Sequence, residues 1–363
     1  MQTHPISVLP FDRAQPRRLA VLLNMNARVV TPRIIRSIQQ VVPPSDLYAS
    51  CSLDDARRIA GEVLRKGYDT VLTGGGDGTF VGYLQAFREE VKQGVSSDGV
   101  LAHDLAPRSL PTLGALRLGT GNALATLSGA APMNGGGVLE DILHVRAGRV
   151  TKTRRLDLIE VDGIAAPFAG FGYDALILNN YLKFKNLLRG TPASPLGEGL
   201  PGYTLSLAFL SIPQALVKSF PDVEVRNDGP PAFHIGDDGE PIGEPIPNGG
   251  LLYKGLARFV SAGTCPHFGF DFRVFPFAGK KPGKMHLRVA STGVVQALAN
   301  LPSIWRGTWR SPSFHDFYAE QVRVTCARPM PLQVGGDAKG YRDELIMRVS
   351  PSPVELIDFN RGG

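Results

Sequence analysis

The chain has 363 residues, 43% of them hydrophobic and 20% charged, and its formal net charge of +6 favours an anionic partner such as a nucleotide, a nucleic acid or an anionic membrane surface. The composition is typical of soluble globular proteins and excludes a chain that is disordered throughout, and the length fits two domains. The three cysteines, Cys51, Cys265 and Cys326, are far apart, which excludes a disulfide framework and a zinc site built on paired cysteines.

The first part of the chain alternates strands with helices. Leu19–Leu23 is an apolar strand, Asn24–Arg28 a polar turn, and Pro32–Gln40 a helix. A second helix begins after Ser52 and ends at Gly67, and a strand follows at Thr70. Such alternation predicts a parallel sheet with helices on its faces, and ligands of such sheets bind at the carboxyl ends of the strands.

Two glycine-rich turns follow strands at that edge. The first lies within Val71–Thr79 (VLTGGGDGT) and carries one carboxylate, Asp77, and the second is LGTGN at Leu118–Asn122. Glycine lets backbone N–H groups approach an anion, and a helix N-terminus behind the turn adds a favourable dipole. The two turns therefore predict a cleft that holds the phosphates of a nucleotide.

The pattern changes near Arg155, beyond which apolar residues recur with a period of two. Phe268–Val274, Met285–Val289 and Val322–Cys326 are expected strands, and 227–250 is an expected loop or hairpin. We predict an α/β N-terminal nucleotide-binding domain with a mainly parallel sheet, plus a mainly antiparallel β-sandwich C-terminal domain. The expected boundaries are 1–152 and 153–349, with 350–363 returning to the first domain.

Five segments in this order resemble the catalytic family of diacylglycerol kinases and related lipid kinases. They are the turn at 24–28, GGDGT at Gly75–Thr79, LGTGN at 118–122, Gly172–Ala175, and QVGGD at Gln333–Asp337. GGDGT alone is weak evidence because NAD kinases share it, but five ordered matches are specific. The resemblance covers nearly the whole chain. It implies a kinase with ATP at the strand ends of the first domain and a lipid acceptor between the domains.

The resemblance also implies roles for individual residues. Asp77 is the candidate general base, with a helix cap or turn residue as the alternative. Asp174 is expected on a strand that faces the cleft and is a candidate contact for the acceptor's head group, with a capped strand end as the equal alternative. ATP and Mg²⁺ are the expected cofactors. The expected phosphate-binding groups are the backbone amides of Gly75, Gly76, Gly78, Gly119 and Gly121, the hydroxyls of Thr79 and Thr120, the side-chain amides of Asn24, Asn26 and Asn122, and the charge of Arg28.

The late signature departs from the family pattern. Gly335 stands where the family has Asp, and Asp337 stands where it has Glu. Asp337 is a second candidate catalytic residue, able to hold Mg²⁺ through water. Pro282 and Gly283 replace an acidic turn, so no metal ligands are assigned.

Two basic segments are candidates for contact with lipid or membrane. Tyr181–Arg189 mixes lysines and an arginine with apolar residues, a mixture that a solvated helix with an apolar stripe against the core produces more often than a ligand site does. The second combines Trp305, Arg306, Trp309 and Arg310 with Lys280, Lys281 and Lys284, and ordinary packing of the tryptophans is its alternative.

The sequence as a whole predicts an ATP-dependent lipid kinase that phosphorylates a hydroxyl of diacylglycerol or a related lipid. NAD kinase is the alternative enzyme, and a degenerate nucleotide- or lipid-binding module without turnover is the alternative class. We find no apolar signal region and no run of about 20 apolar residues, so a cytoplasmic protein with reversible, peripheral contact at the anionic inner membrane surface is expected.

Overall fold

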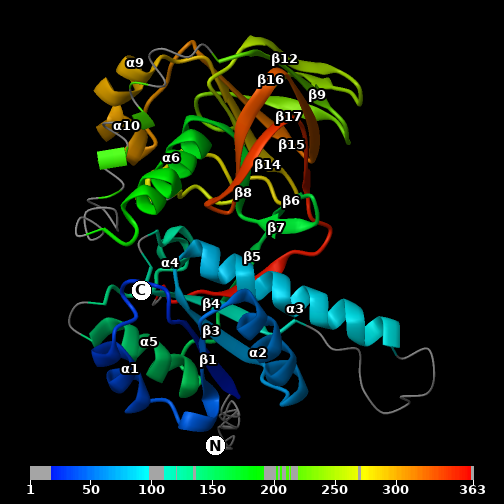
Figure 1. The fold of residues 1–363 in the computed structure, drawn as a ribbon. Coiled ribbons are helices and arrows are strands. Elements are labelled where there is room, and N and C mark those ends of the chain that lie inside the picture. The colour runs from blue at the N-terminus through cyan, green and yellow to red at the C-terminus, as the bar shows by residue number, and fades with distance from the viewer. Residues whose placement is uncertain are drawn as a thin grey trace, which may run out of the picture.

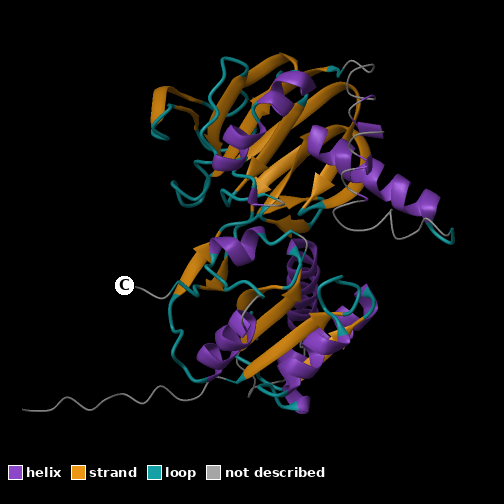
Figure 2. Ribbon diagram, turned by 90° about the vertical axis from the view of Figure 1, so that its left-hand side faces the viewer, coloured by secondary structure: helices purple, strands orange, loops and turns teal. Residues whose placement is uncertain are grey.

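A computed structural model describes residues 18–97, 110–119, 121–133, 136–191, 220–268 and 271–360, with isolated positions at 202, 205–206, 210–211 and 213. Two domains, each built around one sheet, lie one above the other (Figure 1 and Figure 2). This is the architecture predicted from the alternation of periods along the sequence.

The first sheet has the strand order β2-β1-β3-β4-β18-β5 within the described residues. Its strands are β1 (Leu19–Asn24), β2 (Leu47–Ser50), β3 (Thr70–Gly75), β4 (Thr112–Arg117), β5 (Thr153–Leu156) and β18 (Val354–Ile357). All neighbours run parallel except β18 and β5. The carboxyl ends of β1, β3 and β4 therefore lie at one edge, where the polar turn and both glycine turns begin.

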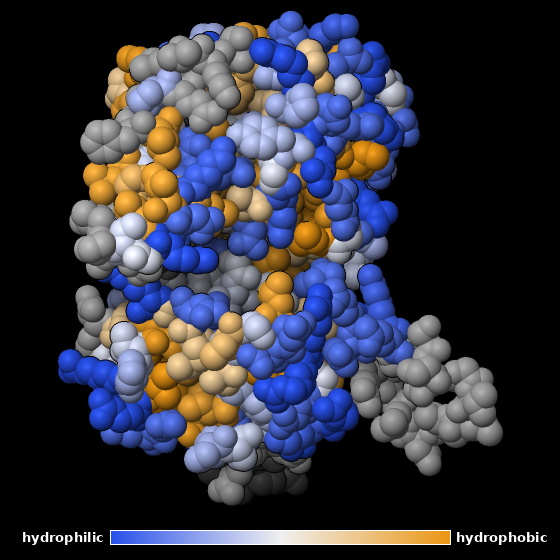
Figure 3. Space-filling view, viewed as in Figure 1, coloured by the Kyte–Doolittle hydropathy of each residue, from blue (hydrophilic) through white to orange (hydrophobic). Residues whose placement is uncertain are grey.

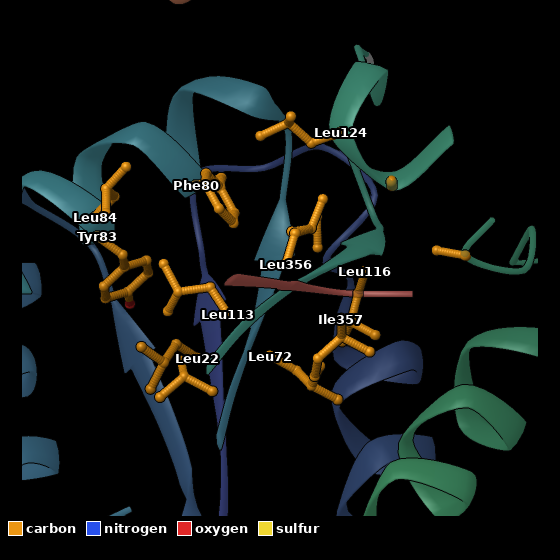
Figure 4. Packing of buried hydrophobic residues seen from close by; sticks show 14 of the residues in the cluster. Leu22, Leu72, Phe80, Tyr83, Leu84, Leu113, Leu116, Leu124, Leu356 and Ile357 are labelled. Atoms are coloured by element: carbon orange, nitrogen blue, oxygen red, sulfur yellow. The ribbon is translucent and has the colours of Figure 1, made fainter. Parts of the chain in front are cut away.

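Helices cover both faces of this sheet (Figure 2). They are α1 (Pro32–Gln39), the 3-10 turn η1 (Pro44–Asp46), α2 (Leu53–Arg65), α3 (Asp77–Ser97), α4 (Ala123–Leu127) and α5 (Gly137–Arg146). Helix α2 begins after Ser52, as predicted, and Ser52 caps it by accepting a hydrogen bond from the Asp55 amide. Phe80 and Tyr83 of α3 are buried against sheet residues such as Leu22 and Leu113 (Figure 4). This packing fixes the first turn of α3 at the end of β3.

The second domain is an antiparallel sheet with the order β11-β10-β15-β14-β13-β8-β16-β17-β6-β7, from which β9 and β12 branch at β16. Its strands are β6 (Ile159–Val161), β7 (Ile164–Ala166), β8 (Phe168–Gly172), β9 (Asp222–Asn227), β10 (Ala232–Ile235), β11 (Pro241–Ile246), β12 (Leu251–Leu256), β13 (Phe259–Gly263), β14 (Met285–Ala290), β15 (Phe314–Ala319), β16 (Gln321–Val334) and β17 (Asp337–Val349). Its helices are α6 (Tyr173–Leu188), α9 (Val294–Ala299) and α10 (Leu301–Arg306).

The strand predicted at Phe268–Val274 is wrong. Within the described part of this segment, Phe268 and 271–274 form a loop, and 269–270 lie outside the described residues. Asp271 has a φ of 62°, a left-handed conformation that a strand cannot contain. Phe268 instead packs its ring against Phe168, with 4.4 Å between centroids. The alternation of phenylalanines in the sequence reflects loop packing rather than a pleated strand.

A leucine at the centre of the first sheet tests this account of the core. Leu72 of β3 is fully buried, so Leu72→Ala should lower the free energy of unfolding by about 2–5 kcal/mol through loss of apolar burial and a residual cavity. Leu53 is 69% exposed at the start of α2, and Leu53→Ala is the matched control, with an expected change within about 0.5 kcal/mol. Urea unfolding followed by circular dichroism measures both, and equal losses would contradict the assigned core.

Candidate active site

A cavity of about 1110 Å³ extends between the two domains, and Figure 3 shows the surface hollowed there. One side of its wall is the edge of the first sheet, with Asn24, Asn26, Arg28, Gly76, Asp77, Gly78, Thr79, Gly119 and Gly121. The other side is largely apolar and comes from the second domain, with Leu176, Ile177, Leu178, Phe259, Val294, Ala297, Leu298, Leu301, Ile304, Trp309 and Phe314. The cavity thus joins a polar end to an apolar chamber.

The two glycine turns are in direct backbone contact. A Cβ atom on Gly119 would lie 2.2 Å from the Cα of Gly76, and one on Gly76 would lie 3.1 Å from the carbonyl oxygen of Gly121. Real Cβ atoms do not approach other atoms as closely as 2.2 Å, so only glycine fits at position 119 without moving the neighbouring turn. The absence of a side chain at these positions is therefore needed for the two turns to pack against each other, before any ligand binds.

Asp77 joins the same two turns through its carboxylate. Its Oδ2 accepts a hydrogen bond from the amide of Ala123, and its Oδ1 accepts one from the amide of Leu124, each at 3.0 Å. These amides form the free N-terminus of α4, so Asp77 caps that helix from another segment of the chain. Burial raises the pKa of Asp77, and the two backbone hydrogen bonds partly oppose this shift. The capping alternative considered for Asp77 is what this geometry shows.

Several predicted phosphate ligands are engaged within the protein. Asn24 donates to the Thr79 hydroxyl at 2.9 Å, and Asn26 donates to the carbonyl of Cys51 at 2.7 Å. Asn122 and Gly119 bond reciprocally, because the Gly119 amide donates to Asn122 Oδ1 at 2.9 Å and Asn122 Nδ2 donates to the Gly119 carbonyl at 2.8 Å. These side chains therefore shape the turns, although they were predicted to face phosphate.

Other donors remain open to the cavity. The amides of Gly76, Gly78 and Gly121 have no hydrogen-bond partner within the part of the chain that the structure describes. Gly78 lies in the first turn of α3, where the helix dipole favours an anion. Arg28 is exposed at the polar end. Gly75 ends β3, and Thr120 lies outside the described residues.

Asp337 faces the first turn of α3 from the second domain. It begins β17 after a tight turn at Gly335 and Gly336, which have φ angles of 60° and 86°. A Cβ on Gly78 would lie 3.4 Å from Asp337 Oδ1. The Asp337 side chain is 60% exposed, yet the surrounding protein displaces enough water to raise its pKa, while Lys339 opposes that shift. A solvent-accessible carboxylate thus stands beside the open amides.

Gly335 stands where the sequence pattern of the resembled family has Asp, so this position carries no carboxylate. A Cβ there would lie 3.1 Å from both Ala166 and Val81, which are buried apolar residues of β7 and α3. The surroundings of position 335 are therefore apolar. They match a turn that packs against α3 rather than a metal ligand.

Asp174 lies in the first turn of α6, and the expectation that it lies on a strand is wrong. Its Oδ2 is near two donors, Ser261 Oγ at 3.4 Å and Gln333 Nε2 at 3.2 Å. Its Oδ1 is shielded from solvent and has no partner among the described residues. Burial raises the pKa of Asp174 to about 6. Such a carboxyl group can change its protonation state near neutral pH.

Two residues of this site carry no role in the sequence prediction. Gln333 also accepts a hydrogen bond from the Gly336 amide at 3.0 Å, so it links Asp174 to the turn before Asp337. Asp271 accepts from the Thr126 hydroxyl at 2.6 Å and pairs with Arg117 at 3.0 Å, which ties a second-domain loop to the first domain. Gln333 stands in the late signature and could have been found there, whereas Asp271 has no sequence signal.

We find no group of three or more His, Cys, Asp or Glu side chains positioned to hold a metal ion in the ranges that the structure describes. Mg²⁺ bound with a nucleotide needs only one or two protein carboxylates, because phosphates and water supply its other ligands. Asp337 fits that requirement, since its carboxylate is accessible at the polar end of the cavity.

The cap formed by Asp77 gives a stability prediction. Asp77→Asn replaces one acceptor oxygen by an NH₂ group, which leaves one amide at the start of α4 without an acceptor. We expect a loss of about 1–3 kcal/mol in the free energy of unfolding and faster amide hydrogen exchange at Ala123 and Leu124. The control is Asp54→Asn, since the Asp54 side chain is 90% exposed. Unchanged exchange at both amides would rule out the cap.

Residues 18–155 match the family model for the diacylglycerol kinase catalytic domain. No protein of curated function matches the sequence. The fold is similar to a crystal structure from Bacillus anthracis str. Sterne described as a diacylglycerol kinase, with 15% identity, a TM-score of 0.57, and coverage of 96% of this chain and 98% of that one. Another from the same organism, described as a candidate diacylglycerol kinase, has 18% identity, a TM-score of 0.60, and coverage of 95% and 99%. At these identities the likeness is one of fold.

Proposed function

We propose that this chain, whose residues 18–155 match the family model for the diacylglycerol kinase catalytic domain, is an ATP-dependent lipid kinase that phosphorylates a hydroxyl of diacylglycerol or a related lipid. The observation that carries the proposal is the single cavity with two chemically different ends. Open amides and Arg28 at one end suit a triphosphate, and the apolar chamber suits acyl chains. The reacting groups would then meet where the two ends join.

Phosphoryl transfer needs positioning and charge stabilisation more than covalent chemistry from the protein. The amides of Gly76, Gly78 and Gly121 and the hydroxyl of Thr79 would bind phosphate oxygens, and the dipole of α3 would favour their charge. Arg28 would add a positive charge. Mg²⁺ would be held by ATP and water, with Asp337 reaching it only through a bound water molecule, and when bound it would supply neutralisation of the phosphate charge.

Two carboxylates compete for the role of general base. Asp77 is 9% exposed, and both its oxygens already accept backbone hydrogen bonds. Asp337 is 60% exposed in the cavity beside Gly78, and its pKa is raised toward the range in which a carboxylate takes protons effectively. These contrasts favour Asp337 as the base that accepts the proton of the lipid hydroxyl. Asp77 is the alternative, because each of its oxygens retains a lone pair.

Asp174 is proposed to contact the head group of the acceptor. Its unpartnered Oδ1 is an acceptor that a lipid hydroxyl can satisfy, and the residue lines the cavity near Tyr173. Ser261 and Gln333 would hold the carboxyl in place by bonding to its other oxygen.

Substitution of the two candidate bases separates their roles. Asp337→Asn should reduce kcat by about 10²–10⁴-fold while ATP affinity changes little, because the change removes a proton acceptor and keeps the side chain's shape. Asp337→Glu should retain measurable turnover. The control is Asp343→Asn, at an exposed position farther along β17. Full turnover in Asp337→Asn, with loss of turnover in a folded Asp77→Asn protein, would assign the base to Asp77 instead.

The pKa of Asp174 gives a pH prediction. Its carboxyl group is raised to about 6, so it is ionised above that pH and becomes protonated below it. If the ionised form accepts the lipid hydroxyl, kcat/KM for the lipid falls as the pH drops below 6. In Asp174→Asn the overall rate should be lower, and the inflection of kcat/KM near pH 6 should disappear. The pH dependence that remains should then come from Asp337. An inflection unchanged in the variant would show that another group titrates.

The acceptor class is tested by transfer from labelled ATP. Purified protein with Mg²⁺ and γ-labelled ATP is offered diacylglycerol, monoacylglycerol, a sphingoid base and NAD in parallel. The proposal expects label in a lipid. Label in NADP would identify a NAD kinase, and ATP binding without transfer to any acceptor would identify a binding module. The apolar chamber argues against a dinucleotide, which would need polar partners there.

We extend the proposal to a cytoplasmic protein that contacts the anionic inner membrane surface peripherally. The net charge of +6 supports attraction to such a surface. Among the described residues, no helix has the length and apolar character needed to cross a bilayer.

A further inference from the structure

The apolar chamber is bordered by three helical segments of the second domain. We define the helical rim as residues 181–189 of α6 together with 294–306, which contain α9 and α10. Val294, Ala297, Leu298, Leu301 and Ile304 line the chamber from the inner side of α9 and α10. Neither α9 nor α10 has a buried residue. The same two short helices therefore form the wall between the chamber and the outside.

The outer side of the helical rim is unusually apolar. Of the thirteen exposed large hydrophobic residues in the described chain, four belong to the helical rim and do not line the cavity: Leu182, Leu187, Val295 and Trp305. Leu187 is 75% exposed and Val295 is 67% exposed. In Figure 3 an apolar area lies on the upper left of the molecule, over the part where Figure 1 places α6 and α10. A contiguous area of this kind marks a binding surface.

The charges on the helical rim all have one sign. Residues 181–189 and 294–306 contain Lys183, Lys185, Arg189 and Arg306 and no acidic residue. None of these four side chains forms an ion pair among the described residues. Basic side chains beside exposed apolar ones, with a half-exposed tryptophan, match the interface of an anionic bilayer, where lysine and arginine reach the headgroups and tryptophan lies at their level.

The wider basic patch expected from the sequence does not form. Lys281 pairs with Glu240 at 2.8 Å and Lys284 with Glu320 at 3.1 Å, while Lys280 donates to the carbonyl of Asp238. Trp309 packs edge-on against Phe314. Of the two tryptophans, Trp305 is 51% exposed and belongs to the helical rim.

We propose that the helical rim docks on an anionic phospholipid bilayer, with Val295, Trp305 and Leu187 inserted at headgroup depth and the basic residues against the phosphates. This inference rests on the proposed lipid acceptor, because docking would place the chamber directly on the source of that lipid. The lipid would then pass from the bilayer into the chamber between apolar walls. Charge complementarity and continuity with the chamber favour a bilayer over a protein partner.

Vesicle cosedimentation with the full chain tests the inference independently of turnover. Wild-type protein should bind phosphatidylcholine vesicles that contain roughly 30 mol% phosphatidylglycerol more tightly than vesicles of pure phosphatidylcholine. Salt should weaken the binding to the anionic vesicles. The variant Val295→Ser/Trp305→Ala should bind the anionic vesicles about tenfold less tightly. Its matched control is Ile242→Ser/Leu251→Ala, which alters exposed apolar residues of β11 and β12.

A second pair of variants tests the charges. Lys183→Gln/Arg306→Gln should weaken binding to anionic vesicles about tenfold, whereas Arg33→Gln/Arg36→Gln on α1 removes the same charge and should have little effect. Equal binding by the rim variants and their controls overturns the inference. It is also overturned if lipid-free wild type is a dimer in sedimentation velocity and Val295→Ser/Trp305→Ala is a monomer, because a second copy then covers the helical rim.

Activity on two forms of the acceptor separates this inference from the proposed function. None of the four altered rim residues lines the cavity. With a short-chain acceptor dispersed as monomers, the rim variants should therefore retain wild-type turnover, and with the acceptor in anionic vesicles their turnover should fall about tenfold. Rim-dependent vesicle binding without transfer to any lipid would support the docking surface and refute the kinase. An equal loss of turnover on both acceptor forms would contradict docking.

Discussion

The backbone contact between the two glycine turns is the constraint on which the site depends. Gly76 and Gly119 approach each other so closely that no side chain fits between them, and the Asp77 carboxylate holds the following helix α4 to the first turn. Because the turns follow β3 and β4, which are adjacent and parallel, this contact is made at the ligand-binding edge of the sheet. A buried carboxylate satisfied by two amides is costly to disturb, so Asp77 contributes to the shape of the cleft whatever its part in catalysis.

The second domain completes the site through one turn and one helix end. The Gly335–Gly336 turn places Asp337 opposite the start of α3. Gln333, two residues before Gly335, forms hydrogen bonds with both the Gly336 amide and the Asp174 carboxyl group. A carboxylate near the open amide of Gly78 and a carboxyl group near the apolar chamber are therefore positioned by a single strand, β16. Asp271 ties the same domain to Arg117 and α4, so the relative placement of the two walls is set by specific polar contacts as well as by packing.

Sequence reasoning identified the fold class, the strands before each glycine turn and the late signature, because these depend on local periodicity and on residues with special backbone freedom. It could not identify contacts between segments far apart in the chain. The hydrogen-bond partners of Asp77 lie 46 and 47 residues away in the chain. The period-two pattern favoured a strand at Phe268–Val274, but Asp271 has a φ of 62°, which is incompatible with a strand. The side-chain amide of Asn122, a predicted phosphate ligand, bonds to the backbone of Gly119, and only the tertiary structure reveals this contact.

We propose above all that one cavity holds a triphosphate at its glycine-lined end and a lipid in its apolar chamber. A crystal structure with a nonhydrolysable ATP analogue and a short-chain diacylglycerol tests it most directly. The account predicts phosphate density within hydrogen-bond distance of the Gly76 and Gly78 amides, and a lipid hydroxyl between Asp174 and Asp337. Nucleotide density elsewhere on the protein, with the glycine turns vacant, would contradict the account.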